Sequence, residues 1–166
     1  MYSYLAAGSG KRVKTYNLAL SDSIGEATFW VPPGDGESSL HVREGAQTII
    51  VERATLDQFE FSDVGFLKVD VEGHEYSVLT GAVETIARSR PNIFIEWEER
   101  HAPGCVERVA SLLMRKHGYS YGYFMHRGSF SPLTDFRVEQ HQDLSTDHVS
   151  SPGYVSNFYF TDRALE

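Results

Sequence analysis

Charged side chains that could do chemistry gather in one short run of the sequence, from residue 68 to residue 75. Alternate positions at its start carry charges: Lys68, Asp70 and Glu72. This period of two predicts the end of a β-strand with the charges on one face. Gly73 then allows a sharp turn, and His74 supplies an imidazole that can exchange a proton near neutral pH. The run predicts a site at a strand end; the alternative is an amphipathic strand with one face in water.

The elements around this run favour a site. From residue 65 the hydrophobic pattern alternates between periods of two and about 3.6, which predicts strands and helices in turn. The expected order is strand 65–71, helix 75–88, strand 93–97, helix 106–114 and strand 119–125, with a last strand at 155–161. Such alternation is typical of an α/β layer with a parallel sheet covered on both faces. Open sheets of this kind bind ligands at the carboxyl ends of their strands.

The chain before residue 60 has a different pattern, because no helical spacing separates its extended segments. These segments cover residues 13–20, 26–31 and 48–52. Turn-forming residues at 21–25 join the first two, so we expect a β-hairpin there. Together the three segments are expected to form an antiparallel patch.

The composition argues against several classes of protein. A net charge of −8 without any basic stripe argues against a nucleic-acid partner. No apolar run approaches the roughly 18 residues of a membrane helix, so we expect no membrane span. The single cysteine, Cys105, cannot form an intrachain disulfide, and the first residues do not resemble a secretory signal, so a cytoplasmic location is expected. The length suits a single domain over residues 1–166.

Several motifs resemble those of one enzyme family. The run FLKVDVEGHEYSVLTGA and the later RPNIFIEW look like the signature of FkbM-type methyltransferases, and NLALSDSIGEATFW and ERATLDQF resemble upstream elements of that family. The resemblance covers roughly residues 17–100, with the motifs in the family's order. It implies an α/β fold, a partial Rossmann-like class I methyltransferase sheet with an inserted antiparallel hairpin. It also implies methyl transfer from S-adenosylmethionine, usually to an oxygen of a small-molecule, sugar or lipid acceptor.

The resemblance also implies roles for the charged residues. Asp70 and Glu72 would bind the cofactor where it meets the acceptor, and the candidate catalytic residues are Asp70, His74 and Lys68. His74 could remove the hydroxyl proton of the acceptor, although a surface histidine at a helix start is an equal alternative. Candidate substrate contacts are Glu75 and Glu96. Glu75 could equally favour a helix dipole, and Glu96 could equally be a solvated strand end.

Two further alternatives concern other acidic residues. Thr55 and Asp57 could form a helix N-cap without any part in chemistry. Carboxylates and an imidazole near the strand end could also hold a metal ion in a different class of enzyme. Adjacent acids are too common to make this a strong signal, so we predict no metal site.

The sequence departs from the family where the cofactor should be held. Methyltransferases of this class carry a glycine-rich turn in the first βα unit and an acidic residue at the end of the second, and neither is found here. The glycine cluster at residues 7–11 also lacks the spacing of a phosphate-binding loop. We therefore expect the C-terminal portion of the fold, with some 60 or more residues missing upstream.

The missing units leave the strand at 65–71 with an open edge, since the family's first strand would lie beside it. Open edges recruit partners, so we expect either a homo-oligomer formed through this edge or a hairpin that covers it. Two functions follow as alternatives. The chain is a methyltransferase or the acceptor-side portion of one, or it is a non-catalytic domain that serves binding or assembly.

Overall fold

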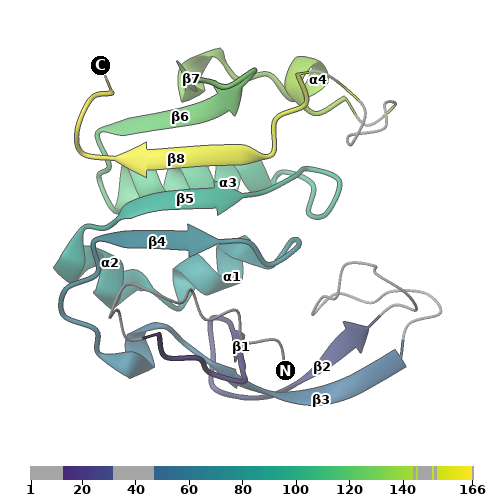
Figure 1. Cartoon of the computed structure of the whole chain (residues 1–166), viewed down its shortest axis with the longest axis vertical. Coiled ribbons are helices and arrows are strands. Elements are labelled where there is room, and N and C mark those ends of the chain that lie inside the picture. Colours follow the sequence, from purple (N-terminus) through teal and green to yellow (C-terminus); the bar gives the residue numbers. More distant parts are fainter. Residues whose placement is uncertain (1–12, 32–46, 144, 146–150, 152, 166) are drawn as a thin grey trace.

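The computed structural model describes residues 13–31, 47–143, 145, 151 and 153–165. In this part of the chain the strands form two separate sheets, and helices lie beside the larger one (Figure 1). The smaller sheet contains β1 (Ala19–Leu20), β2 (Gly25–Val31) and β3 (Gln47–Ala54) in the order β1-β3-β2. The larger contains β4 (Phe66–Val69), β5 (Asn92–Glu96), β8 (Asn157–Thr161), β6 (Tyr121–His126) and β7 (Ser129–Pro132), in that order.

The prediction of a β-hairpin formed by residues 13–20 and 26–31 is wrong. Strand β2 pairs antiparallel with β3 instead, from Gly25 opposite Arg53 to Val31 opposite Gln47. Strand β1 is only two residues long and pairs parallel with the other edge of β3. The long strand β3 therefore separates β1 from β2, because it offers β2 a ladder along its whole length. The expectation of a wholly antiparallel patch is correct for β2 and β3 and wrong for β1.

The larger sheet is mixed, so the expected parallel sheet is only partly correct. Strand β4 pairs parallel with β5, whereas β8 runs antiparallel between β5 and β6. Two phenylalanines of β8, Phe158 and Phe160, are fully buried. Their ring centroids lie 4.6 and 6.5 Å from that of Trp97, which follows β5. This aromatic packing holds the last strand in the middle of the sheet.

The helix expected over residues 75–88 is divided into α1 (Glu75–Thr80) and α2 (Val83–Ser89). A side chain far away in sequence supports the second helix. The two carboxylate oxygens of Asp57 accept the backbone N–H groups of Glu84 and Thr85 at 3.0 and 2.8 Å. Thr55 Oγ1 accepts the N–H of Gln58 at 3.3 Å. Both side chains thus act as helix caps. Asp57 caps α2 and not the short 3₁₀ helix η1 (Asp57–Phe59) in which it lies.

The remaining helices are α3 (Cys105–Ala110), which continues as the π-helical turn η2 (Ser111–Lys116), the 3₁₀ turn η3 (Leu133–Asp135) and the short helix α4 (Val138–His141). Figure 1 shows α1, α2 and α3 on one face of the larger sheet. The core lies between them and that face, where Leu79, Ile86, Ile93 and Ile95 are fully buried. No described helix is long and apolar enough to span a membrane.

Strand β4 is not covered on both faces, contrary to the expectation from the flanking helices. Val69 points into the core with 2% of its surface exposed, whereas Phe66 on the opposite face is 57% exposed. The exposed face has no helix against it among the described residues (Figure 1). The period of two in this strand therefore reflects one dry and one wet face.

The free edge of β4 has no strand paired with it in the part of the chain that the structure describes, as expected. Among the described strands only β5 pairs with β4. The N–H of Asn92 donates to the carbonyl of Gly65 at 3.1 Å. Because alternate residues of a parallel strand bond to the same neighbour, Leu67 also bonds to β5, and the backbone groups of Phe66 and Lys68 face outward. The smaller sheet does not pair with this edge.

Candidate functional site

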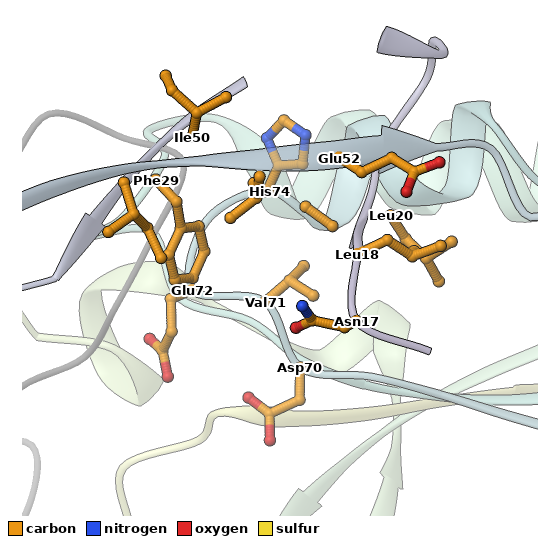
Figure 2. Close-up of a pocket in the computed structure, with 13 residues that line it drawn as sticks. Asn17, Leu18, Leu20, Phe29, Ile50, Glu52, Asp70, Val71, Glu72 and His74 are labelled. Atoms are coloured by element: carbon orange, nitrogen blue, oxygen red, sulfur yellow. The ribbon is translucent and has the colours of Figure 1, made fainter. Parts of the chain in front are cut away.

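A cavity of about 710 Å³ lies between the smaller sheet and the turn that follows β4. Its lining residues are Asn17, Leu18, Ala19, Leu20, Phe29, Ile49, Ile50, Val51, Glu52, Asp70, Val71, Glu72 and His74. Figure 2 shows these side chains around the cavity, with β3 crossing opposite Asp70 and Val71. One wall is therefore mainly apolar and the other carries two carboxylates and an imidazole.

The backbone turn after β4 brings the polar residues to the cavity. Glu72 and Gly73 adopt positive φ angles of 49° and 99°, which is the left-handed conformation that glycine adopts without strain. The N–H of Gly73 donates to Glu75 Oε1 at 2.9 Å, and the N–H of His74 donates to the Val71 carbonyl at 3.3 Å. Glu75 is 2% exposed. Its carboxylate therefore helps to hold the turn and does not line the cavity.

Lys68, Asp70 and Glu96 form a charged group on the open side of β4 and β5. The Lys68 ammonium lies 2.5 Å from Asp70 Oδ2 and 4.0 Å from Glu96 Oε2. The hydrogen bond to Asp70 raises the pKa of Lys68, with smaller contributions from the charges of Asp70 and Glu96, and partial burial opposes the shift. Lys68 is therefore a cation at neutral pH that orients Asp70. Of the three, only Asp70 lines the cavity.

Glu72 has a partner that sequence reasoning missed. Its Oε2 atom lies 3.3 Å from His101 Nδ1, and only 9% of the His101 side chain is exposed. His101 lies in the loop between β5 and α3, where no motif was found in the sequence. Its proximity to Glu72 depends on the pairing of β4 with β5, so a single sequence contains no local signal for it.

His74 also has an unpredicted partner. The Ser21 hydroxyl oxygen lies 2.9 Å from His74 Nε2, and Ser21 is fully buried. The sequence marked residues 21–25 only as turn formers. Because 53 residues separate the two side chains, only the packing of the smaller sheet against α1 brings them together.

The predicted site residues thus divide into two sets. Asp70, Glu72 and His74 line one wall of the cavity, whereas Lys68, Glu75 and Glu96 lie outside its lining. In the described ranges, no group of three His, Cys, Asp or Glu side chains is arranged to hold a metal ion.

A comparison with protein families bears on this arrangement. The model described as the methyltransferase FkbM domain matches residues 3–121, which is more than half of the chain. The chain belongs to the FkbM methyltransferase family. The FkbM match runs from before β1 to the first residue of β6, so it includes both walls of the cavity. No curated protein and no solved structure shows a significant match to the chain.

Proposed function

We propose that this chain is an S-adenosylmethionine-dependent O-methyltransferase of the FkbM type that acts on a hydroxyl group of a small molecule, sugar or lipid. The observation that carries the proposal is the cavity of about 710 Å³ with Asp70, Glu72 and His74 on one wall. Its volume lies in the range of about 300–1,000 Å³ that is typical of small-molecule sites. It lies just beyond the carboxyl end of β4, where open α/β sheets bind ligands.

The two walls suit the two parts of the cofactor. Leu18, Leu20 and Ile50 offer apolar surface to the flat adenine ring. Asp70 and Glu72 would accept hydrogen bonds from ribose hydroxyls or an amino group. When bound, S-adenosylmethionine supplies a methyl group attached to a positively charged sulfonium. No glycine-rich turn follows a strand before β4 in the described residues, so in this proposal the two walls of the cavity, and not such a turn, contact the cofactor.

The remaining charged residues would orient the acceptor and hold its proton. His74 would accept the hydroxyl proton, since an unperturbed imidazole titrates near neutral pH. Lys68 would fix the orientation of Asp70. Glu96, whose side chain is 39% exposed, would contact the acceptor, and buried Glu75 would support the turn at Gly73. Positioning should contribute more than acid–base help, because methyl transfer depends mainly on alignment.

The test is calorimetric titration of the full chain with S-adenosylmethionine, with and without magnesium. We expect micromolar binding that does not require the metal. Asp70→Asn should weaken binding at least about tenfold, the loss of roughly one charge-assisted hydrogen bond. Asp63→Asn is the matched control, because Asp63 is exposed and lies outside the cavity lining, and its binding should equal that of the wild type. Absence of binding by the wild-type chain under both conditions would refute the proposal.

A second candidate function is assembly, which the open edge of β4 specifically favours. Outward-facing backbone groups at Phe66 and Lys68, together with the exposed ring of Phe66, form a surface to which another strand can add. A second copy of the chain would join there and extend the sheet. In this function the charged turn would contribute to binding without chemistry.

Light scattering after size-exclusion chromatography tests assembly. A dimer is expected, and Phe66→Pro should convert it to a monomer, because the lost N–H faces the open edge and not β5. Phe66→Leu is the matched control, since it keeps the N–H and an apolar side chain. A strictly monomeric wild type, or a Phe66→Pro dimer as stable as the control, contradicts assembly through this edge.

A further inference from the structure

A buried serine connects the smaller sheet to the turn after β4. Ser21 follows β1, and its N–H donates to the Ala54 carbonyl at 2.8 Å. Its own carbonyl oxygen lies against Gly81, so close that a Cβ atom built there would be 2.0 Å away. These contacts hold the backbone of Ser21 from both sides. Its hydroxyl group therefore has a defined position beside His74.

Two side chains lie within hydrogen-bonding distance of that hydroxyl. His74 Nε2 is 2.9 Å from Ser21 Oγ, and Asp22 Oδ1 is 3.2 Å from it. The hydroxyl of Ser23 donates to the same Asp22 oxygen at 3.0 Å. Asp22, Ser21 and His74 thus form a continuous row of polar groups from the surface to the cavity.

The charge of Asp22 decides which atoms donate in this row. The hydrogen bond from Ser23 lowers the pKa of Asp22, slight burial opposes the shift, and the hydroxyl of Ser21 and a charge on His74 lower it further. At neutral pH the carboxylate is therefore ionised and can only accept hydrogen bonds. Ser21 has a single hydroxyl proton. Both contacts are satisfied only when Ser21 donates to Asp22 and accepts from His74 Nε2.

We infer that Ser21, together with Asp22, is a positioning residue that keeps the proton of neutral His74 on Nε2 and its basic electron pair on Nδ1. The inference rests on the proposed function only for its chemical meaning, namely that a hydroxyl proton of the acceptor would pass to Nδ1. The carboxylates that line the same cavity are Glu52, Asp70 and Glu72, and all of them lie on elements other than the β1–β2 turn.

The tautomer can be measured in the protein without any ligand. Long-range ¹H–¹⁵N NMR correlation of the uniformly labelled chain, above the pH at which His74 loses its charge, distinguishes protonated from unprotonated ring nitrogens. We expect Nε2 to be protonated in the wild type. Asp22→Ala removes the acceptor of the Ser21 proton, so Ser21 should then donate to Nε2, and the Nδ1-protonated fraction of His74 should rise. Asp22 is exposed, so this substitution should leave the fold intact.

Ser62→Ala, in the exposed loop before β4, is the control and should leave the His74 signals unchanged. A wild-type His74 protonated on Nδ1, or an Asp22→Ala spectrum identical to that of the control, would overturn the inference. Neither outcome depends on binding of S-adenosylmethionine. The test can therefore fail while the proposed function holds, and it can succeed while calorimetry shows no cofactor binding.

Discussion

Among the described glycines, Gly81 is the position where an added methyl group should be most damaging. It follows α1 with φ −80° and ψ 5°, a conformation that alanine adopts without strain. A Cβ atom there would lie 2.0 Å from the Ser21 carbonyl oxygen and 3.0 Å from its carbon. Ordinary contacts between heavy atoms need about 3.5–4.0 Å. The backbone at residues 21 and 22 must therefore move by about 1.5 Å in a Gly81→Ala variant.

The cost can be worked out from the contacts that would be lost. Overpacking a close contact costs about 1–3 kcal/mol. A displacement of this size also breaks the hydrogen bonds of Ser21 with Ala54 and His74, each worth about 1 kcal/mol. We therefore expect Gly81→Ala to reduce the free energy of unfolding by about 3–5 kcal/mol. For a chain of this size the melting temperature should fall by roughly 10 °C.

Differential scanning calorimetry measures this change, and Gly65→Ala is the matched control. A Cβ atom at Gly65 would meet nothing within 4 Å, so its melting temperature should be unchanged or slightly higher. A Gly81→Ala variant that melts within about 2 °C of the wild type would refute the steric reasoning. It would mean that the smaller sheet does not pack on the α1–α2 junction as described.

Further predictions concern three side chains, of which Cys105 and Gln142 are buried. Burial raises the pKa of Cys105 from 9.0 to about 12, so iodoacetamide should label the folded protein much more slowly than the urea-unfolded protein at pH 8.5; equal rates would contradict this. Because the thiol loses its proton more readily when unfolded, the free energy of unfolding should fall as the pH rises above about 9, and Cys105→Ala should reduce that slope in urea titrations. Asp57→Ala should lower the free energy of unfolding by about 1 kcal/mol, because α2 loses its cap. Asp63→Ala should leave the free energy of unfolding unchanged. Gln142→Leu should lower the free energy of unfolding by about 3 kcal/mol, because Gln142 is fully buried and hydrogen-bonds Glu99, Trp97 and Val155. Urea denaturation measures both the Asp57 and the Gln142 variants, and an unchanged free energy of unfolding would contradict the prediction for that variant.

The features that depend on local pattern could be predicted from the sequence. The strand at β4, the turn at Gly73 and the apolar face of residues 78–86 follow from periodicity and from the conformational freedom of glycine. The position of Asp70 near the carboxyl end of β4 also follows, since the alternation of charged and apolar residues runs through Asp70 and Glu72 and stops at Gly73. The family motifs lie in the same segment.

The features that depend on distant pairing could not be predicted. The helix over residues 75–88 is divided where Asp57, 27 residues away from Glu84, caps α2. The hydrophobic periodicity of residues 75–88 does not predict that hydrogen bond. The hairpin predicted before residue 32 was wrong for a similar reason. Turn residues between two extended segments suggest that the segments pair, whereas β2 pairs with β3 along a longer ladder. Ser21 and His101 contact residues of the site only through the packing and pairing of distant strands, so the sequence alone does not identify them.

The position of β8 has a consequence for biosynthesis. This strand comes last among the described strands, yet it lies between β5 and β6. During translation, β5 and β6 leave the ribosome well before the strand that joins them. Until residues 157–161 emerge, those two strands lack their shared neighbour and the aromatic rings of Phe158 and Phe160. Closure of the larger sheet is therefore a late event with long-range contacts, the type that folds slowly and leaves hydrophobic edges exposed to chaperones in the meantime.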